Sequence, residues 1–307
     1  MKKILFKGAA SAVPTPFDEN GVNVNEFKKF LKFQIENNID ALVVCGTTGE
    51  SSTMTKEEKI IAIKCALEIA NKKVPVIVGT GSNNTLEAIK MSKLAEELGA
   101  DGVLVVTPYY NKTTQLGLIS HYRAIAENIS IPIILYNVPS RTGLNIEPKT
   151  CFELSKIDNI VAIKEASGNI SQIAQISSLC KDNLYIYSGN DDQTIPICSL
   201  GGIGVISVLS NIKPQFTHDM IWNFLDGNII NAKEKQLSIL PLIDILFSEV
   251  NPIPIKALLN ELGFNFGIPR LPLLELSTDK KLLIKQYLKA RLSFYLIVVL
   301  NLLIHNI

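Results

Sequence analysis

The sequence predicts an α/β fold: a closed (β/α)8 TIM barrel with additional C-terminal helices. Three observations support this prediction. Eight short apolar runs recur along the chain, amphipathic segments separate most of them, and no GxGxxG loop follows the first run. Strands that alternate with helices pair in parallel, because each helix carries the chain back across the sheet. Eight such units favour a closed barrel, and the missing glycine motif argues against an open doubly wound sheet.

The apolar runs are the expected barrel strands. They begin near Ala9, Ala41, Pro75, Gly102, Pro132, Ile160, Leu184 and Gly204. A helix is expected at residues 56–73, where Ile60, Ile63 and Leu67 share one face. Thr55 and Glu58 have the spacing of a capping box at its start. The next helix is expected at residues 85–98, with Gly99 as its left-handed terminating residue.

The chain continues well beyond the eighth strand. We therefore expect three parts: a catalytic barrel at residues 1–225, a C-terminal helical segment at 226–289, and an atypical apolar tail at 290–307. Helices are predicted over 222–247 and 254–262. The apolar stretch 293–304 is shorter than the ~20 residues that cross a bilayer, so no membrane contact is expected.

Composition excludes several classes of function. Thirty basic and 29 acidic side chains give a net charge of +1 without a basic block, so we expect no nucleic-acid partner. Three histidines and five scattered cysteines form no metal-binding pattern, and no metal or other cofactor is predicted. The amino terminus lacks the apolar stretch of a signal peptide. The predicted location is the cytoplasm.

Lys164 is the most informative residue. It ends the apolar run 160–163, and a charge in a strand buried on both faces carries a desolvation cost. Burial lowers the pKa of a lysine and leaves a free amine that can condense with a carbonyl as a Schiff base. For Lys164 alone, an ammonium that points into water is the simpler interpretation.

Polar side chains follow other predicted strands as well. In a barrel of this type the carboxyl ends of the strands meet at one rim, where reactive groups collect. The segments expected there are Gly46–Ser51, Thr107–Tyr110, Tyr136–Gly143, Lys164–Glu165 and Ser188–Asp192. Each segment alone is compatible with an ordinary turn or strand end. Their joint occurrence at one rim favours a catalytic site.

These residue types suit a keto-acid reaction. The hydroxyls and amides of Thr47 and Thr48 can bind a carboxylate. Schiff-base chemistry moves several protons, and Tyr136, Thr47 and Tyr110 are candidates for a relay. Arg141 can bind the carboxylate of a second substrate through its guanidinium fork.

The motifs Gly46–Glu50 and Tyr136–Gly143, followed by the strand that carries Lys164, together resemble the dihydrodipicolinate synthase family of class I aldolases. The resemblance covers residues 1 to about 289. It implies a lyase that condenses pyruvate with aspartate semialdehyde to 4-hydroxy-tetrahydrodipicolinate, on the route to diaminopimelate and lysine. It also implies a homotetramer, a dimer of tight dimers, although a dimer is possible.

The resemblance assigns a role to each matching residue. Lys164 would form the Schiff base, Tyr136 would transfer protons, and Thr47 and Tyr110 would complete the relay, with Tyr110 reaching a neighbouring subunit. The substrate-binding residues would be Thr48 for pyruvate, Arg141 for the semialdehyde, and Gly189 and Ile206 as lining residues.

Many relatives are inhibited by lysine, and the resemblance places that allosteric site here as well. The matching positions are Ser51, Ser52, Lys56, Lys59, Asn83, Glu87 and Tyr109. Lys56 and Lys59 stand where lysine-sensitive members carry histidines, and two added cations repel a cationic effector. We therefore expect weak or absent feedback inhibition by lysine.

Three other functions remain open on the sequence alone. The first is a sister aldolase, such as N-acetylneuraminate lyase or a keto-deoxy sugar acid aldolase. The second is a barrel that binds a keto acid without turnover. The third is a phosphate-binding isomerase, for which the glycine-rich loop Leu200–Gly204 is weak support.

Overall fold

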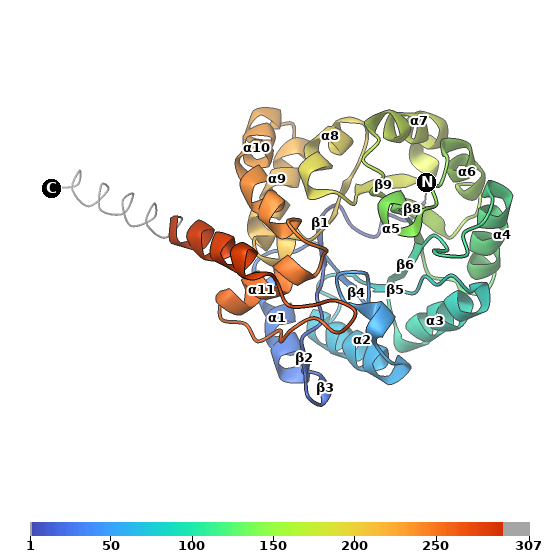
Figure 1. Ribbon diagram of the computed structural model, residues 1–307. Helices are drawn as coiled ribbons and strands as arrows, with labels where there is room; N and C mark the ends of the chain where they lie inside the picture. The colour runs from blue at the N-terminus through green and yellow to red at the C-terminus, as the bar shows by residue number, and fades with distance from the viewer. Residues whose placement is uncertain (1, 291–307) are drawn as a thin grey trace.

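The computed structural model describes residues 2–290, and the apolar stretch 293–304 lies outside the described residues. Eight parallel strands close into a barrel in which β1 pairs with both β10 and β4. Helices surround the strands, as Figure 1 shows. The barrel strands are β1 Gly8–Ala12, β4 Ala41–Val44, β5 Val76–Gly79, β6 Gly102–Val106, β7 Ile133–Asn137, β8 Ile160–Glu165, β9 Tyr185–Ser188 and β10 Gly204–Ser207. The predicted barrel is confirmed, and all eight strands begin within one residue of their predicted starts.

Each barrel strand leads into at least one helix. The helices of the barrel are α1 Val24–Glu36, α2 Lys56–Ala70, α3 Thr85–Leu98, α4 Gln115–Ala126, α5 Pro139–Thr142, α6 Pro148–Leu154, α7 Ile170–Cys180, α8 Thr194–Ser199 and α9 Pro214–Leu225. Short 3-10 turns occur at η1 Ser51–Thr53, η2 Lys181–Asn183, η3 Asp191–Gln193 and η4 Leu209–Asn211. Helices α10 Ile229–Leu246 and α11 Ile253–Glu261 follow, and residues 278–290 are also helical.

Capping residues in the sequence correctly predicted where α2 begins and where α3 ends. The capping box of α2 forms as predicted, with the Thr55 side chain accepting from the Glu58 amide and Glu58 accepting from the Thr55 amide. Helix α3 ends at Gly99, which has a φ of 96° and carries no Cβ to clash. Helix α2 ends at Ala70, earlier than predicted, because Asn71 adopts a left-handed conformation with φ 43°.

Two sequence predictions were wrong or incomplete. The helix predicted over 222–247 is two helices, α9 and α10, because Gly227 breaks the chain at φ 88°. The hairpin of β2 (Phe17–Asp18) and β3 (Gly21–Val22), which follows β1, was not predicted. Two-residue strands are too short to produce a recognisable alternation.

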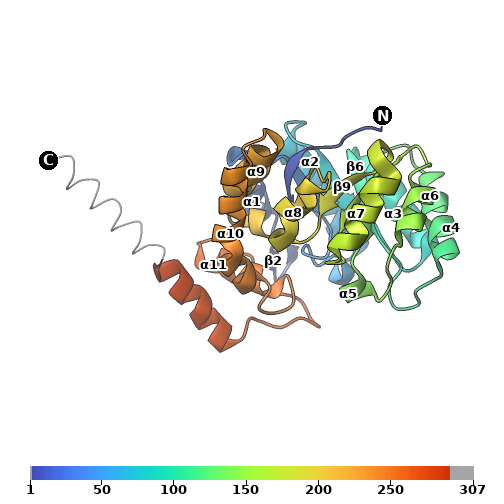
Figure 2. The same cartoon turned by 90° about the horizontal axis from the view of Figure 1, so that it is seen from above.

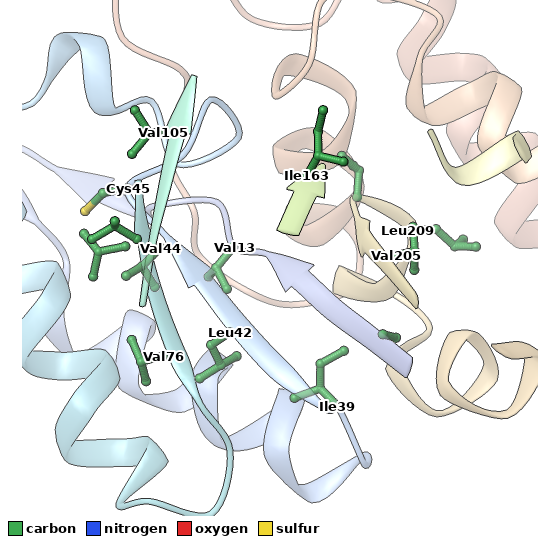
Figure 3. Packing of buried hydrophobic residues seen from close by; sticks show 14 of the residues in the cluster. Val13, Ile39, Leu42, Val44, Cys45, Val76, Val105, Ile163, Val205 and Leu209 are labelled. Atoms are coloured by element: carbon green, nitrogen blue, oxygen red, sulfur yellow. The ribbon is translucent and has the colours of Figure 1, made fainter. Parts of the chain in front are cut away.

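The buried side chains form two layers. The larger layer lies between the strands and the surrounding helices, and Figure 3 shows Leu42, Val44 and Val205 within it. The smaller layer fills the barrel interior and includes Ile77, Leu104, Ile134 and Ile206. Near the amino ends of the strands, Phe6 stacks on Tyr187 with ring centroids 4.3 Å apart. Side chains therefore fill this end of the interior.

None of the helices in the described part of the chain is long and apolar enough to cross a membrane. The five cysteines are all buried and unpaired, as expected for small apolar side chains.

A polar cluster ties α9 to the barrel at the amino ends of the strands. The Asp40 carboxylate accepts from the Ala9 amide at 2.7 Å, from His218 Nδ1 at 2.9 Å and from Trp222 Nε1 at 3.2 Å. The hydrogen bond from His218 to Asp40, opposed in part by burial, raises the pKa of the imidazole. The cluster is therefore most stable when His218 is protonated.

This cluster predicts a pH-dependent stability. Because the pKa of His218 is raised on folding, its contribution is complete below the ordinary value of 6.5 and is lost as the pH rises through the higher folded-state value. The free energy of unfolding, measured with urea from about pH 6 to about pH 9, is expected to depend less on pH in His218→Gln than in the native chain. Equal pH dependence in the two proteins would contradict this assignment.

Candidate active site

The carboxyl ends of the strands surround a cavity of about 190 Å³. Six of the eight residues predicted as catalytic or substrate-binding line it: Thr47, Thr48, Tyr136, Arg141, Lys164 and Gly189. They come from the ends of β7 and β8, from the loops after β4 and β9, and from the short helix α5, which contains Arg141. The parallel barrel thus brings together side chains that are far apart in the sequence.

Lys164 is buried, with only 7% of its surface exposed, so the interpretation of a lysine that points into water was wrong. Its Nζ lies 4.4 Å from the ring centroid of Tyr136. The two residues are register partners on the adjacent strands β8 and β7. A Cβ at Gly189 would lie 3.1 Å from Lys164 Cε and 2.7 Å from Ala166 Cβ. The glycine therefore leaves the room that the lysine side chain occupies.

A second pair of buried residues lies one position further along the same strands. The Glu165 carboxylate accepts from Asn137 Nδ2 at 3.0 Å, from the Ser167 amide at 2.7 Å and from Gln172 Nε2 at 3.4 Å. Burial raises the pKa of Glu165, and these hydrogen bonds oppose the effect. Asn137 also donates to Asn145 Oδ1 at 2.9 Å. This network fixes the ends of β7 and β8, and so the alignment of Tyr136 with Lys164.

Asp191 is a further buried carboxylate near the lysine. Its Oδ2 accepts from the amides of Val208 and Leu209, both at 3.0 Å, while its Oδ1 has no hydrogen-bond partner within residues 2–290. Burial raises the pKa of Asp191, whereas hydrogen bonds and the charge of Lys164 lower it. Asp191 could not be distinguished from its neighbour Asp192 before the structure, since both follow β9.

Asn251 is a site residue that the sequence did not reveal. It lies between α10 and α11 and lines the same cavity. Its Nδ2 donates to Thr48 Oγ1 at 2.9 Å, and its carbonyl accepts from an Arg141 guanidinium nitrogen at 3.3 Å. Asn251 therefore links the two residues predicted to bind carboxylates. No local motif marks it, because its partners lie on distant loops.

Two predicted residues lie apart from this group. Tyr110 has φ 69° and is 91% exposed, so it makes no contribution to the cavity within its own chain. Ile206 is buried in the inner layer of the barrel and does not line the cavity. The glycine-rich loop Leu200–Gly204 precedes β10 and therefore lies at the opposite rim.

A larger cavity of about 560 Å³ adjoins the first and shares Thr47, Tyr136 and Arg141 with it. It is lined by six of the seven residues predicted for the allosteric site: Ser51, Ser52, Lys56, Lys59, Glu87 and Tyr109. Asn83 does not line it, and its carbonyl accepts from Asn111 Nδ2 at 2.9 Å. Glu87 pairs with Lys90 at 2.7 Å. Lys56 and Lys59 thus contribute positive charge to the walls of this cavity.

The model of the dihydrodipicolinate synthetase family matches residues 5–291. The chain belongs to this family. A relative from Clostridium acetobutylicum, 4-hydroxy-tetrahydrodipicolinate synthase 1, is 58% identical over 277 residues, which cover 90% of this chain and 94% of the relative. The family predicted from the three motifs is confirmed.

Solved structures of dihydrodipicolinate synthases have the same fold. The chloride-inhibited enzyme of Acinetobacter baumannii, complexed with pyruvate, superposes with a TM-score of 0.90 and 40% identity, covering 92% of this chain and 98% of the enzyme. The enzyme of Cyanidioschyzon merolae with lysine bound gives a TM-score of 0.90 and 40% identity, covering 92% and 97%. Both similarities extend over the barrel and most of the segment that follows it.

Proposed function

We propose that this synthetase-family chain condenses pyruvate with L-aspartate 4-semialdehyde through a Schiff base on Lys164. The activity that the motifs predicted is also the one named for the curated relatives. The observation that carries the mechanism is the buried Lys164 amine, placed against Tyr136 in a cavity that also contains Thr48 and Arg141. Two groups that can bind carboxylates, in the same cavity as one buried amine, suit the joining of two carboxylate substrates.

The first half of the reaction activates pyruvate. Thr48 and the adjacent Thr47 bind its carboxylate, Thr47 also takes part in the proton relay, and the Lys164 amine attacks the C2 carbonyl carbon. Tyr136 transfers protons as the carbinolamine forms and loses water to give the iminium. Loss of a proton from C3 then yields the enamine, whose C3 is the nucleophile for the second substrate. No metal is required, since the iminium itself withdraws electrons from C3.

The second half forms the carbon–carbon bond. Arg141 binds the carboxylate of the semialdehyde and orients its aldehyde carbon toward the enamine. As C3 of the enamine bonds to the aldehyde carbon, the aldehyde oxygen takes up a proton to become the 4-hydroxyl and C2 becomes an iminium again. The amino group of the semialdehyde then attacks C2 and displaces Lys164. This closes the ring of 4-hydroxy-tetrahydrodipicolinate and regenerates the free lysine.

Three predicted site residues, Tyr110, Gly189 and Ile206, take no part in the steps above. We assign Tyr110 to the relay of a neighbouring chain in a homotetramer, because it is exposed beside the rim and cannot serve its own cavity. Gly189 and Ile206 act by shape, the first in the cavity wall and the second in the layer beneath it.

We also propose that the enzyme acts in the cytoplasm, as expected for biosynthesis from these substrates.

The role of Lys164 is tested by reduction with borohydride in the presence of pyruvate. Mass spectrometry should find pyruvate fixed on Lys164 in the native chain and on no residue in Lys164→Ala, which should lose at least about three orders of magnitude in kcat. Lys93→Ala, which removes an exposed lysine of α3, is the matched control. Full activity of Lys164→Ala would sink the proposed mechanism.

The role of Arg141 is tested by comparing the two substrates. Arg141→Met should raise KM for the semialdehyde by about tenfold to a hundredfold, because a charged hydrogen bond to its carboxylate is lost. The yield of borohydride-trapped pyruvate at saturation should remain close to native. A variant in which the two KM values rise equally would contradict a role specific to the second substrate.

The larger cavity leads to a prediction about regulation. Lys56 and Lys59 in its wall repel a cation, so lysine at sub-millimolar concentration should leave the rate unchanged. The double variant Lys56→His/Lys59→His, assayed near pH 8, should become more sensitive to lysine because neutral imidazoles replace two positive charges. Clear inhibition of the native enzyme by sub-millimolar lysine would refute the prediction.

A further inference from the structure

A buried ion pair connects the segment after the barrel to the loop that contains Thr47 and Thr48. Lys256 Nζ lies 2.8 Å from Glu50 Oε1, and the side chains are 0% and 1% exposed. Lys256 belongs to α11, which lies outside the ring of strands beside α10 (Figures 1 and 2). Glu50 follows the carboxylate-binding residues by only two positions.

The ion pair has a complete set of partners. Glu50 Oε2 accepts from the Arg270 amide at 2.8 Å, and Lys256 also donates to the Ile268 carbonyl at 3.3 Å. The Phe17 ring covers the pair, with Lys256 Nζ 4.7 Å from its centroid. A buried pair of this kind contributes little net stability, because the desolvation of both charges offsets their attraction. The ion pair therefore matters for the geometry of the two segments that it connects.

The loop conformation depends on Glu50. This residue adopts a left-handed backbone with φ 55°, and its amide donates to the Thr47 carbonyl at 3.1 Å. A non-glycine residue in this conformation requires its surroundings to hold it. The Glu50 side chain is anchored by α11 and Arg270, so these contacts maintain the turn that directs Thr47 and Thr48 toward the cavity.

The positive charge of Lys256 has a second effect, which concerns the Glu50 carboxylate. The Glu50 carboxylate lies close in sequence to the site that we propose for the pyruvate carboxylate, and an unpaired anion there would repel the substrate. Lys256 neutralises it. Arg270, the other nearby cation, is bound to the Glu58 carboxylate by two nitrogens at 2.8 and 2.5 Å.

We infer that Lys256 is a positioning residue for pyruvate binding: through Glu50 it sets both the conformation and the charge of the Thr47–Thr48 loop. This inference rests on the proposed function. It makes α11 a part of the active site, although none of its residues lines the smaller cavity.

The test compares Lys256→Met, Glu50→Gln and the double variant Lys256→Met/Glu50→Gln, which removes both charges with similar volumes. Lys256→Met should raise the pyruvate KM most, by about tenfold or more, because it leaves a bare carboxylate and a loosened loop. The double variant should be more thermally stable than Lys256→Met, while its pyruvate KM remains several-fold above that of the native chain. In each variant KM should change more than kcat, since Lys164 and Tyr136 are untouched.

The matched control is Lys28→Met/Glu68→Gln, which removes an exposed ion pair of 2.7 Å between α1 and α2. It should leave the pyruvate KM unchanged. A double variant of Lys256 and Glu50 with native stability and native pyruvate KM would overturn the inference and show that the pair acts only on folding.

A measurement on the native chain applies even if the variants do not fold. Pyruvate should slow amide hydrogen exchange in residues 46–54 and also in residues 253–262, because the two segments share the ion pair. Protection of 46–54 alone would overturn the inference. Borohydride trapping separates this outcome from failure of the proposed function: absence of pyruvate on Lys164 in the native chain refutes the latter, whatever the exchange shows.

Discussion

The closure of eight parallel strands is the constraint on which the rest of the structure depends. All eight strands pair in parallel, and the pairing of β1 with both β10 and β4 closes the ring. The carboxyl ends then form one rim, and residues from β4, β7, β8 and β9 meet there. The stacked Phe6 and Tyr187 fill the opposite end of the interior. The cavity with its polar side chains lies at this rim, away from the packed end.

Burial of charge distinguishes this rim from the surrounding surface. Lys164, Glu165 and Asp191 are all buried near the ends of β8 and β9, and Lys256 and Glu50 are buried beneath the β4 loop. Each of these side chains has hydrogen bonds or an opposite charge that offsets the desolvation of its ionised form. Lys164 lies against the Tyr136 ring and interacts with the charge of Asp191. The charged groups at this rim therefore depend on one another.

Much of the fold and part of the site could be predicted from the sequence because their signals are local. Apolar runs located the strands, and Thr55 with Glu58 located the start of α2. The placement of Lys164, Tyr136 and Arg141 at one cavity followed from the topology alone. Asn251 and Lys256 could not be found in this way, because each acts through a partner some 200 residues distant in the chain. Long-range pairing of this kind leaves no periodicity or spacing for a single sequence to show.

The residues proposed to activate the keto acid lie on strands β7 and β8, whereas those proposed to bind carboxylates lie outside the strands. Lys164 and Tyr136 face each other across adjacent strands, and Asn137 and Glu165 repeat the pairing one step beyond. The proposed nucleophile and its proposed proton-transfer partner are thus held by backbone hydrogen bonds of the scaffold, whereas Thr48 lies in the loop after β4 and Arg141 in the short helix α5. Loops can be lengthened or exchanged without disturbing a strand register. A barrel built in this way can acquire new acceptor substrates during evolution while it retains a single way of activating a keto acid.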